Sequence, residues 1–145
     1  MKNEDFGKAM TIIKGASFVR YVKTFAELDS LSEKEKKDVN EKMKPICIEV
    51  IQLLRKAYKN EPTNPEISWE LVKILHLNHL RIAKYGTMTE KLEAVKTGFK
   101  ADDGRQIMGY ANMIFYHAEI CSKFDTKGMY KNELPKITNI YNSIK

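Results

Sequence analysis

The sequence is poor in the residues that usually build a metal site. It has two cysteines, Cys47 and Cys121, and neither forms a Cys-x-x-Cys motif or pairs with a histidine at the spacing of a zinc site. Both lie among apolar residues at helical spacing, and free cysteine is among the most buried residue types. We therefore predict two buried, reduced thiols, with no disulfide and no zinc site.

Catalytic motifs are absent as well. The sequence has no glycine-rich phosphate loop, no Ser-His-Asp or Cys-His arrangement and no His-Glu-x-x-His motif. We interpret the chain as a protein without catalytic activity and without a cofactor.

Arginine is scarce although the chain is basic. Four arginines stand within a total of 25 Lys and Arg residues, and the formal net charge is +6. Arginine is preferred for paired hydrogen bonds to phosphates and base edges, whereas lysines scattered among glutamates usually form a solvated surface. The charge still favours anionic partners, so Lys96, Lys100 and Arg105, near a predicted helix junction, are the candidate contacts to nucleic acid.

Long apolar runs are missing. Charged residues interrupt every run well before the roughly 20 residues that a membrane span needs. The N-terminal stretch carries acidic residues early and no uninterrupted apolar block, unlike a secretory signal. With 43% hydrophobic and 30% charged residues, the composition is that of a soluble globular protein. We expect one helical domain over residues 1–145, located in the cytoplasm and not associated with a membrane.

Sustained alternation of apolar and polar residues does not occur, and we find no two-residue hairpin motif. Apolar residues recur instead at helical spacing. We predict an all-α fold: a single bundle of five to seven helices joined by short loops, with central helices at about 66–85 and 104–124.

Start and stop residues frame the first central helix. Asn64, Pro65 and Glu66 supply an N-cap, a proline in the first turn and an early acid, and Gly86 is placed for a left-handed C-terminal residue. Helical structure is also expected at 5–28, either as one helix with a bend near Gly15 or as two shorter helices. A further helix is expected from Ser32, which Pro45 either kinks or divides, and a short one at 88–99. A last helix is expected to be capped by Asn132, with Pro135 in its first turn.

Two of these helices carry broad apolar faces. In the short helix, Met88, Leu92, Val95 and Phe99 mark one apolar face. The central helix at 104–124 is expected to start at a cap supplied by Asp102 or Asp103, and it is apolar over more than half of its circumference.

One polar residue lies where the first central helix should be driest. Asn78 falls in the middle of the main apolar stripe. A buried amide without hydrogen-bond partners destabilises a fold by about 1–3 kcal/mol. Asn78 therefore predicts either a polar contact between helices or a polar group that lines a pocket or a subunit seam.

The three histidines are the candidates for a metal or ligand site. His76 and His79 lie three residues apart on one helix, and His117 belongs to the second central helix. A metal site needs at least a third protein ligand, and no such ligand is identifiable from spacing. We interpret His76 and His79 as core residues and His117 as a hydrogen-bonded core residue.

Three hypotheses for function follow. The first is a non-catalytic helical interaction module, a small subunit or accessory factor of a larger assembly, which binds a protein partner or itself. Its contact patch would come from the mismatched apolar faces of the first helix or from the last helix. The second is nucleic-acid binding through surface lysines. The third is a small metal-dependent or ligand-binding helical protein that uses His76, His79 and His117.

Overall fold

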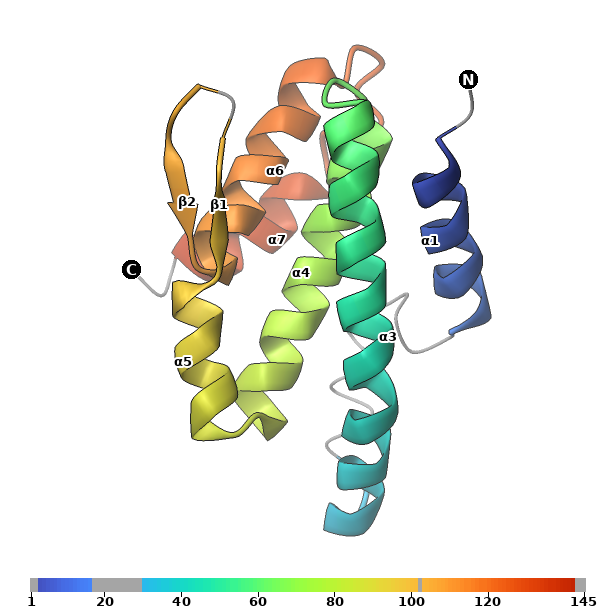
Figure 1. Ribbon diagram of the computed structural model, residues 1–145, viewed down its shortest axis with the longest axis vertical. Coiled ribbons are helices and arrows are strands. Elements are labelled where there is room, and N and C mark those ends of the chain that lie inside the picture. Colours follow the sequence, from blue (N-terminus) through green and yellow to red (C-terminus); the bar gives the residue numbers. More distant parts are fainter. Residues whose placement is uncertain (1–2, 17–29, 102, 143–145) are drawn as a thin grey trace.

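The computed structural model describes residues 3–16, 30–101 and 103–142, with side chains up to residue 139. These residues form the predicted all-α multi-helix bundle, together with one small hairpin that was not predicted (Figure 1). The elements are α1 (Glu4–Gly15), α3 (Glu33–Asn60), α4 (Pro65–Tyr85), α5 (Met88–Lys96), β1 (Gly98–Lys100), β2 (Gln106–Met108), α6 (Tyr110–Phe124) and α7 (Leu134–Asn142). Residues 17–28 of the predicted first helix lie outside the described residues.

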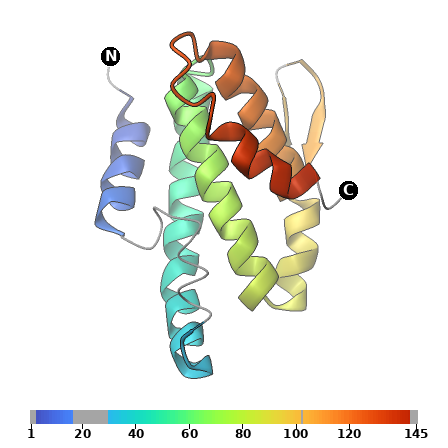
Figure 2. The same cartoon turned by 180° about the vertical axis from the view of Figure 1, so that it is seen from behind.

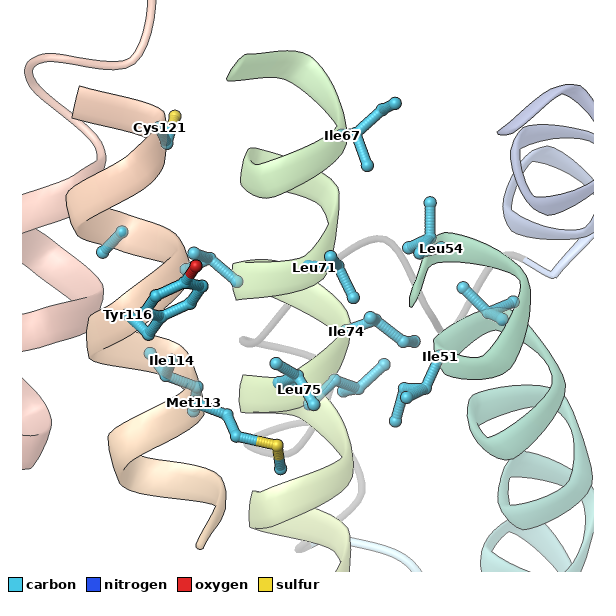
Figure 3. Close-up of a cluster of buried hydrophobic side chains, with 14 of the residues drawn as sticks. Ile51, Leu54, Ile67, Leu71, Ile74, Leu75, Met113, Ile114, Tyr116 and Cys121 are labelled. Atoms are coloured by element: carbon cyan, nitrogen blue, oxygen red, sulfur yellow. The ribbon is translucent and has the colours of Figure 1, made fainter. Parts of the chain in front are cut away.

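The centre of the bundle is α4, which lies between α3 and α6 (Figure 3). Its apolar side chains contact those of α3 on one side and those of α6 on the other, and together they form the core. The side chains labelled in Figure 3 are Ile67, Leu71, Ile74 and Leu75 from α4, Ile51 and Leu54 from α3, and Met113, Ile114, Tyr116 and Cys121 from α6. Cys47 and Cys121 are both buried free thiols, as expected.

The ends of α4 show why it begins and stops where it does. Asn64 caps the start by accepting a hydrogen bond from the backbone N–H of Glu66, and Pro65 occupies the first turn, as predicted. The expectation of a left-handed Gly86 is wrong, because its φ is −71° and its ψ is 153°. Glycine is needed there for a different reason, since a Cβ atom would lie 2.5 Å from the carbonyl oxygen of Ile82.

The helix α3 starts at a capping box and runs for 28 residues. Ser32 accepts from the N–H of Glu35, whose side chain bonds back to Ser32, as the sequence predicts. Pro45 lies inside this helix and does not divide it. The helix α1 packs on α3, and Asn3 ties the two together by donating to the carbonyl oxygen of Ala57 at 2.9 Å.

The prediction of a central helix at 104–124 is wrong at its start. The helix α6 begins only at Tyr110, and Gln106–Met108 pairs instead with Gly98–Lys100 as an antiparallel hairpin. Gly104 has a φ of +89° and closes the turn by donating to the carbonyl oxygen of Ala101. Asp103-Gly104 is a typical hairpin turn sequence, and the side chain of Asp103 bonds the backbone N–H of Arg105 rather than capping a helix.

The hairpin also ends α5 earlier than expected, at Lys96 rather than near residue 99. Figures 1 and 2 show α5 at the outer edge of the bundle, beside the C-terminal half of α4, with the hairpin continuing from it. The last helix, α7, starts at Leu134 with Pro135 in its first turn and packs on α6 (Figure 2). No described helix is long and apolar enough to cross a lipid bilayer.

Candidate functional site

A buried polar network connects α4 to α5 and α6. Asn78 is 1% exposed, and its side-chain amide donates to the hydroxyl of Tyr110 at 2.7 Å. Its carbonyl oxygen accepts from Nε of Arg81 at 2.9 Å. The amide therefore has partners for both its donor and its acceptor, which removes the penalty of burying it. This contact joins helices, and Asn78 also lines a cavity of about 170 Å³ behind α5.

Arg81 is the centre of this network, and it was not among the candidate residues predicted from the sequence. Its side chain is 1% exposed, yet its guanidinium is held by three acceptors. Besides the bond to Asn78, Nη1 donates to Oδ1 of Asn40 at 3.2 Å and to Oε2 of Glu90 at 3.1 Å. Lys44 approaches the other carboxylate oxygen of Glu90 at 3.6 Å. A buried arginine is tolerated only when it is paired in this way.

Glu90 is the counter-charge that α5 supplies. Burial alone would raise the pKa of this carboxyl group, but the hydrogen bond and charge of Arg81, together with Lys44 and the N–H of its own helix cap, hold the pKa below its ordinary value. Glu90 is therefore ionised at neutral pH. The ion pair fixes which side of α5 faces the bundle, because Glu90 must point toward Arg81.

The apolar face of α5 consequently points outward. Met88, Leu92 and Val95 are 70%, 51% and 66% exposed, whereas the inner side of the helix carries Glu90 and the buried Ala94. An apolar stripe at this spacing usually faces the core. Here it is turned to solvent. The described parts of the two helices that the sequence suggested as sources of a contact patch, α1 and α7 up to residue 139, expose no large hydrophobic residue, and the second apolar face predicted for the first helix lies outside the described residues.

His76 and His79 are neighbours on α4, whereas His117 lies on α6. His76 is fully buried in α4, where burial and then the nearby His79 lower its pKa to about 4. His79 stacks on the Tyr110 ring at 5.9 Å and 9°, and burial lowers its pKa as well. His117 is on α6. Within the described residues, no group of three or more His, Cys, Asp and Glu side chains is placed to hold a metal ion.

The three candidate nucleic-acid contacts differ in their surroundings. Arg105 is engaged by acids: its Nε lies 2.8 Å from Oδ2 of Asp103, and its Nη1 lies 3.9 Å from Oε2 of Glu119. Lys100 lines a second cavity, between α3, β1 and α6, whereas Lys96 is exposed at the end of α5. They do not form one uninterrupted basic surface, because the charge of Arg105 is neutralised locally.

Comparison with protein-family models, with curated proteins and with solved structures finds no match to this chain.

Proposed function

We propose that the chain is a non-catalytic helical interaction module that binds an acidic, amphipathic helix of a partner protein through α5. The observation that carries the proposal is the outward orientation of Met88, Leu92 and Val95. Their spacing places three apolar side chains along about 10 Å of helix, on one face. Helices that dock side by side use anchors at this spacing.

The charges beside the stripe indicate the chemistry of the partner. Lys91 and Lys96 are exposed on either flank of the stripe, while Glu90 points inward to Arg81. Basic flanks favour a partner helix whose apolar stripe is bordered by aspartate or glutamate, since opposite charges at the rim select partners and speed association.

The same charges disfavour a second copy of this chain as the occupant. Two α5 helices packed stripe to stripe would bring Lys91 and Lys96 of one copy close to the lysines of the other, in either relative direction. The net charge of +6 adds a general repulsion between copies. Like charges at an interface act against that pairing, so a different, acidic protein is favoured.

The test is a binding measurement with a synthetic peptide. A fluorescent peptide of about 18 residues, or five helical turns, carries a leucine stripe flanked by glutamates. We expect saturable binding, and we expect Leu92→Gln to weaken it roughly tenfold, because completing the burial of a half-exposed leucine contributes about 1–1.5 kcal/mol.

Two controls make the test specific. Met129→Gln removes an equally exposed hydrophobic residue, 67% against 70% for Met88, from a distant loop and should leave the affinity unchanged. A scrambled peptide of the same composition should bind much more weakly. Equal binding of the scrambled peptide, or an unchanged affinity of Leu92→Gln, contradicts the proposal. Light scattering on the protein alone should show a monomer, whereas a dimer lost in Leu92→Gln would make a second copy the occupant.

A further inference from the structure

A second cavity, of about 230 Å³, lies on a different part of the molecule from the α5 stripe and shares no residue with it. Three elements form its walls: the last turns of α3, the end of β1 and the middle of α6. Figure 1 shows the hairpin and the upper part of α3 on either side of α6. The lining residues are Arg55, Tyr58, Lys59, Phe99, Lys100, Ala101, Tyr116 and His117.

The charged lining residues are all cations. Arg55 and Lys59 come from consecutive turns of α3, and Lys100 comes from the hairpin. None of the three forms an ion pair with any carboxylate of the described residues. This differs from Arg81 and Arg105, each of which is matched by acids. Three unmatched cations around one cavity create a positive potential that attracts an anion.

The inner wall of the cavity carries a polar group that lacks a partner. His117 is 2% exposed, and its Nδ1 is buried without a hydrogen-bond partner among the described residues. The prediction of a hydrogen-bonded core histidine is therefore wrong for Nδ1, although the side chain is buried as expected. Burial, and then the charge of Arg55, lower the pKa of His117 to about 3, so the imidazole is neutral at physiological pH.

Aromatic rings hold these groups in place. The ring of His117 stacks on Phe99 at 5.7 Å and meets Tyr58 edge-on at 5.0 Å. The guanidinium of Arg55 lies over the Phe99 ring at 5.5 Å. The hydroxyls of Tyr58 and Tyr116 are hydrogen-bonded at 2.8 Å. Because Phe99 is already engaged by His117 and Arg55, it offers little stacking surface to a nucleobase.

We propose that this cavity is a binding site for the phosphate group of a small phosphorylated molecule. A phosphate monoester carries a charge near −2 and several strong acceptor oxygens. It can therefore pair with three cations from two elements, whereas a carboxylate has one charge and only two oxygens. The guanidinium of Arg55 offers paired hydrogen bonds, and Lys59 and Lys100 offer point charges. Tyr58, Tyr116 and His117 line the same cavity and add polar groups to its wall.

The test is an NMR titration of the full chain with inorganic phosphate, with phenyl phosphate and with a short oligothymidylate. The signals of the His117 imidazole and of the Arg55 side chain report on the cavity directly. We expect saturable shifts of both signals with phenyl phosphate, and weaker binding of inorganic phosphate. Arg55→Gln and Lys59→Gln should each weaken binding of phenyl phosphate roughly tenfold, since each removes a charged hydrogen-bond donor.

Lys56→Gln is the matched control for Lys59→Gln. Both residues are exposed lysines on α3, both substitutions remove one positive charge, and only Lys59 lines the cavity. Lys56→Gln should leave the affinity within about twofold of wild type. Because Lys59 is at the surface, its variant will fold even if Arg55→Gln loses stability with the Phe99 contact.

Each outcome decides the proposal. If the oligonucleotide binds, shifts His117 and depends on Lys59 but not on Lys56, the site is real and its phosphate comes from a nucleic acid strand. Equal weakening by Lys56→Gln and Lys59→Gln, or binding that leaves His117 unshifted, would show only a general attraction to lysines and overturn the site. The absence of saturable binding by all three probes would overturn it as well.

Discussion

Nη1 of Arg81 lies 3.1 Å from Oε2 of Glu90, and this pair couples a cation that is 1% exposed to the inner side of the short helix α5. The ion pair explains why α5 keeps its apolar residues outside. If α5 rolled its stripe toward the core, Arg81 would lose its counter-charge in a place that water cannot reach. The orientation of the proposed docking surface is thus set by a polar contact inside the bundle.

Removing the charge of Glu90 should therefore destabilise the fold. Glu90→Gln leaves Arg81 buried without its counter-charge, so we expect a loss of about 2–4 kcal/mol in the free energy of unfolding. Glu93→Gln makes the same chemical change at an exposed position of the same helix and should alter stability by less than about 0.5 kcal/mol. Urea denaturation of both variants measures the difference, and equal effects would contradict a structural role for the pair.

Asn78 offers a second substitution with a graded outcome. Asn78→Ala removes the acceptor for Arg81 and the donor to Tyr110, and should lower stability by about 2–3 kcal/mol. Asn78→Asp keeps an acceptor for the guanidinium and adds a favourable charge, while Tyr110 can donate instead of accept. At neutral pH the aspartate variant should be clearly more stable than the alanine variant in urea denaturation. The reverse order would mean that Arg81 does not depend on this acceptor.

Stability should fall in mild acid because of the buried histidines. The folded pKa values of His76 and His117 are lowered to about 4 and about 3. The unfolded chain, in which histidine has a pKa near 6.5, therefore binds more protons. Stability is complete above pH 6.5 and declines as the pH falls from there, by about 1.4 kcal/mol per pH unit for each histidine until its folded pKa is reached. In His76→Gln the slope between pH 6 and 4.5 should be smaller by that amount, and an unchanged slope would show that His76 does not titrate as described.

Two glycine substitutions test the backbone of α1 and of the hairpin. A Cβ at Gly98 would overlap the carbonyl oxygen of Ile107 on the neighbouring strand, so Gly98→Ala should destabilise the hairpin by about 1–3 kcal/mol. A Cβ at Gly7, inside α1, meets nothing within 4 Å, so Gly7→Ala should stabilise by about 0.5–1 kcal/mol. Thermal unfolding of the two variants should move in opposite directions, and a shift in the same direction would contradict this local geometry.

Much of the helical fold was predictable because its determinants are local. Each of these determinants acts within a single helix: Ser32 caps α3, and Asn64 and the apolar stripe belong to α4. The structure confirms all three. The hairpin was missed because Asp103 suits both a helix cap and a turn before glycine. The pairing of Gly98–Lys100 with Gln106–Met108 decided between them, and that is a contact between segments.

Only part of the candidate site could be predicted from the sequence, because the rest depends on contacts between different helices. The buried position of Asn78 follows from its place in the apolar stripe, but Arg81 is unremarkable until Asn40 and Glu90 are brought to it from two other helices. A hint was available, since Arg81 lies between apolar residues three positions after Asn78. The outward orientation of α5 could not be predicted from helical spacing, because spacing defines a face and not its direction.

The most direct test of the account is the reactivity of individual methionines to oxidation in the native protein, followed by peptide mass spectrometry. Met88 and Met129 are similarly exposed, at 70% and 67%, whereas Met43 and Met113 are 0% and 3% exposed. With α5 oriented by Arg81 and Glu90, Met88 should be oxidised about as fast as Met129 and roughly tenfold faster than Met43 and Met113. If Met88 is instead protected to the degree of Met43, the stripe faces inward and the proposed docking surface does not exist.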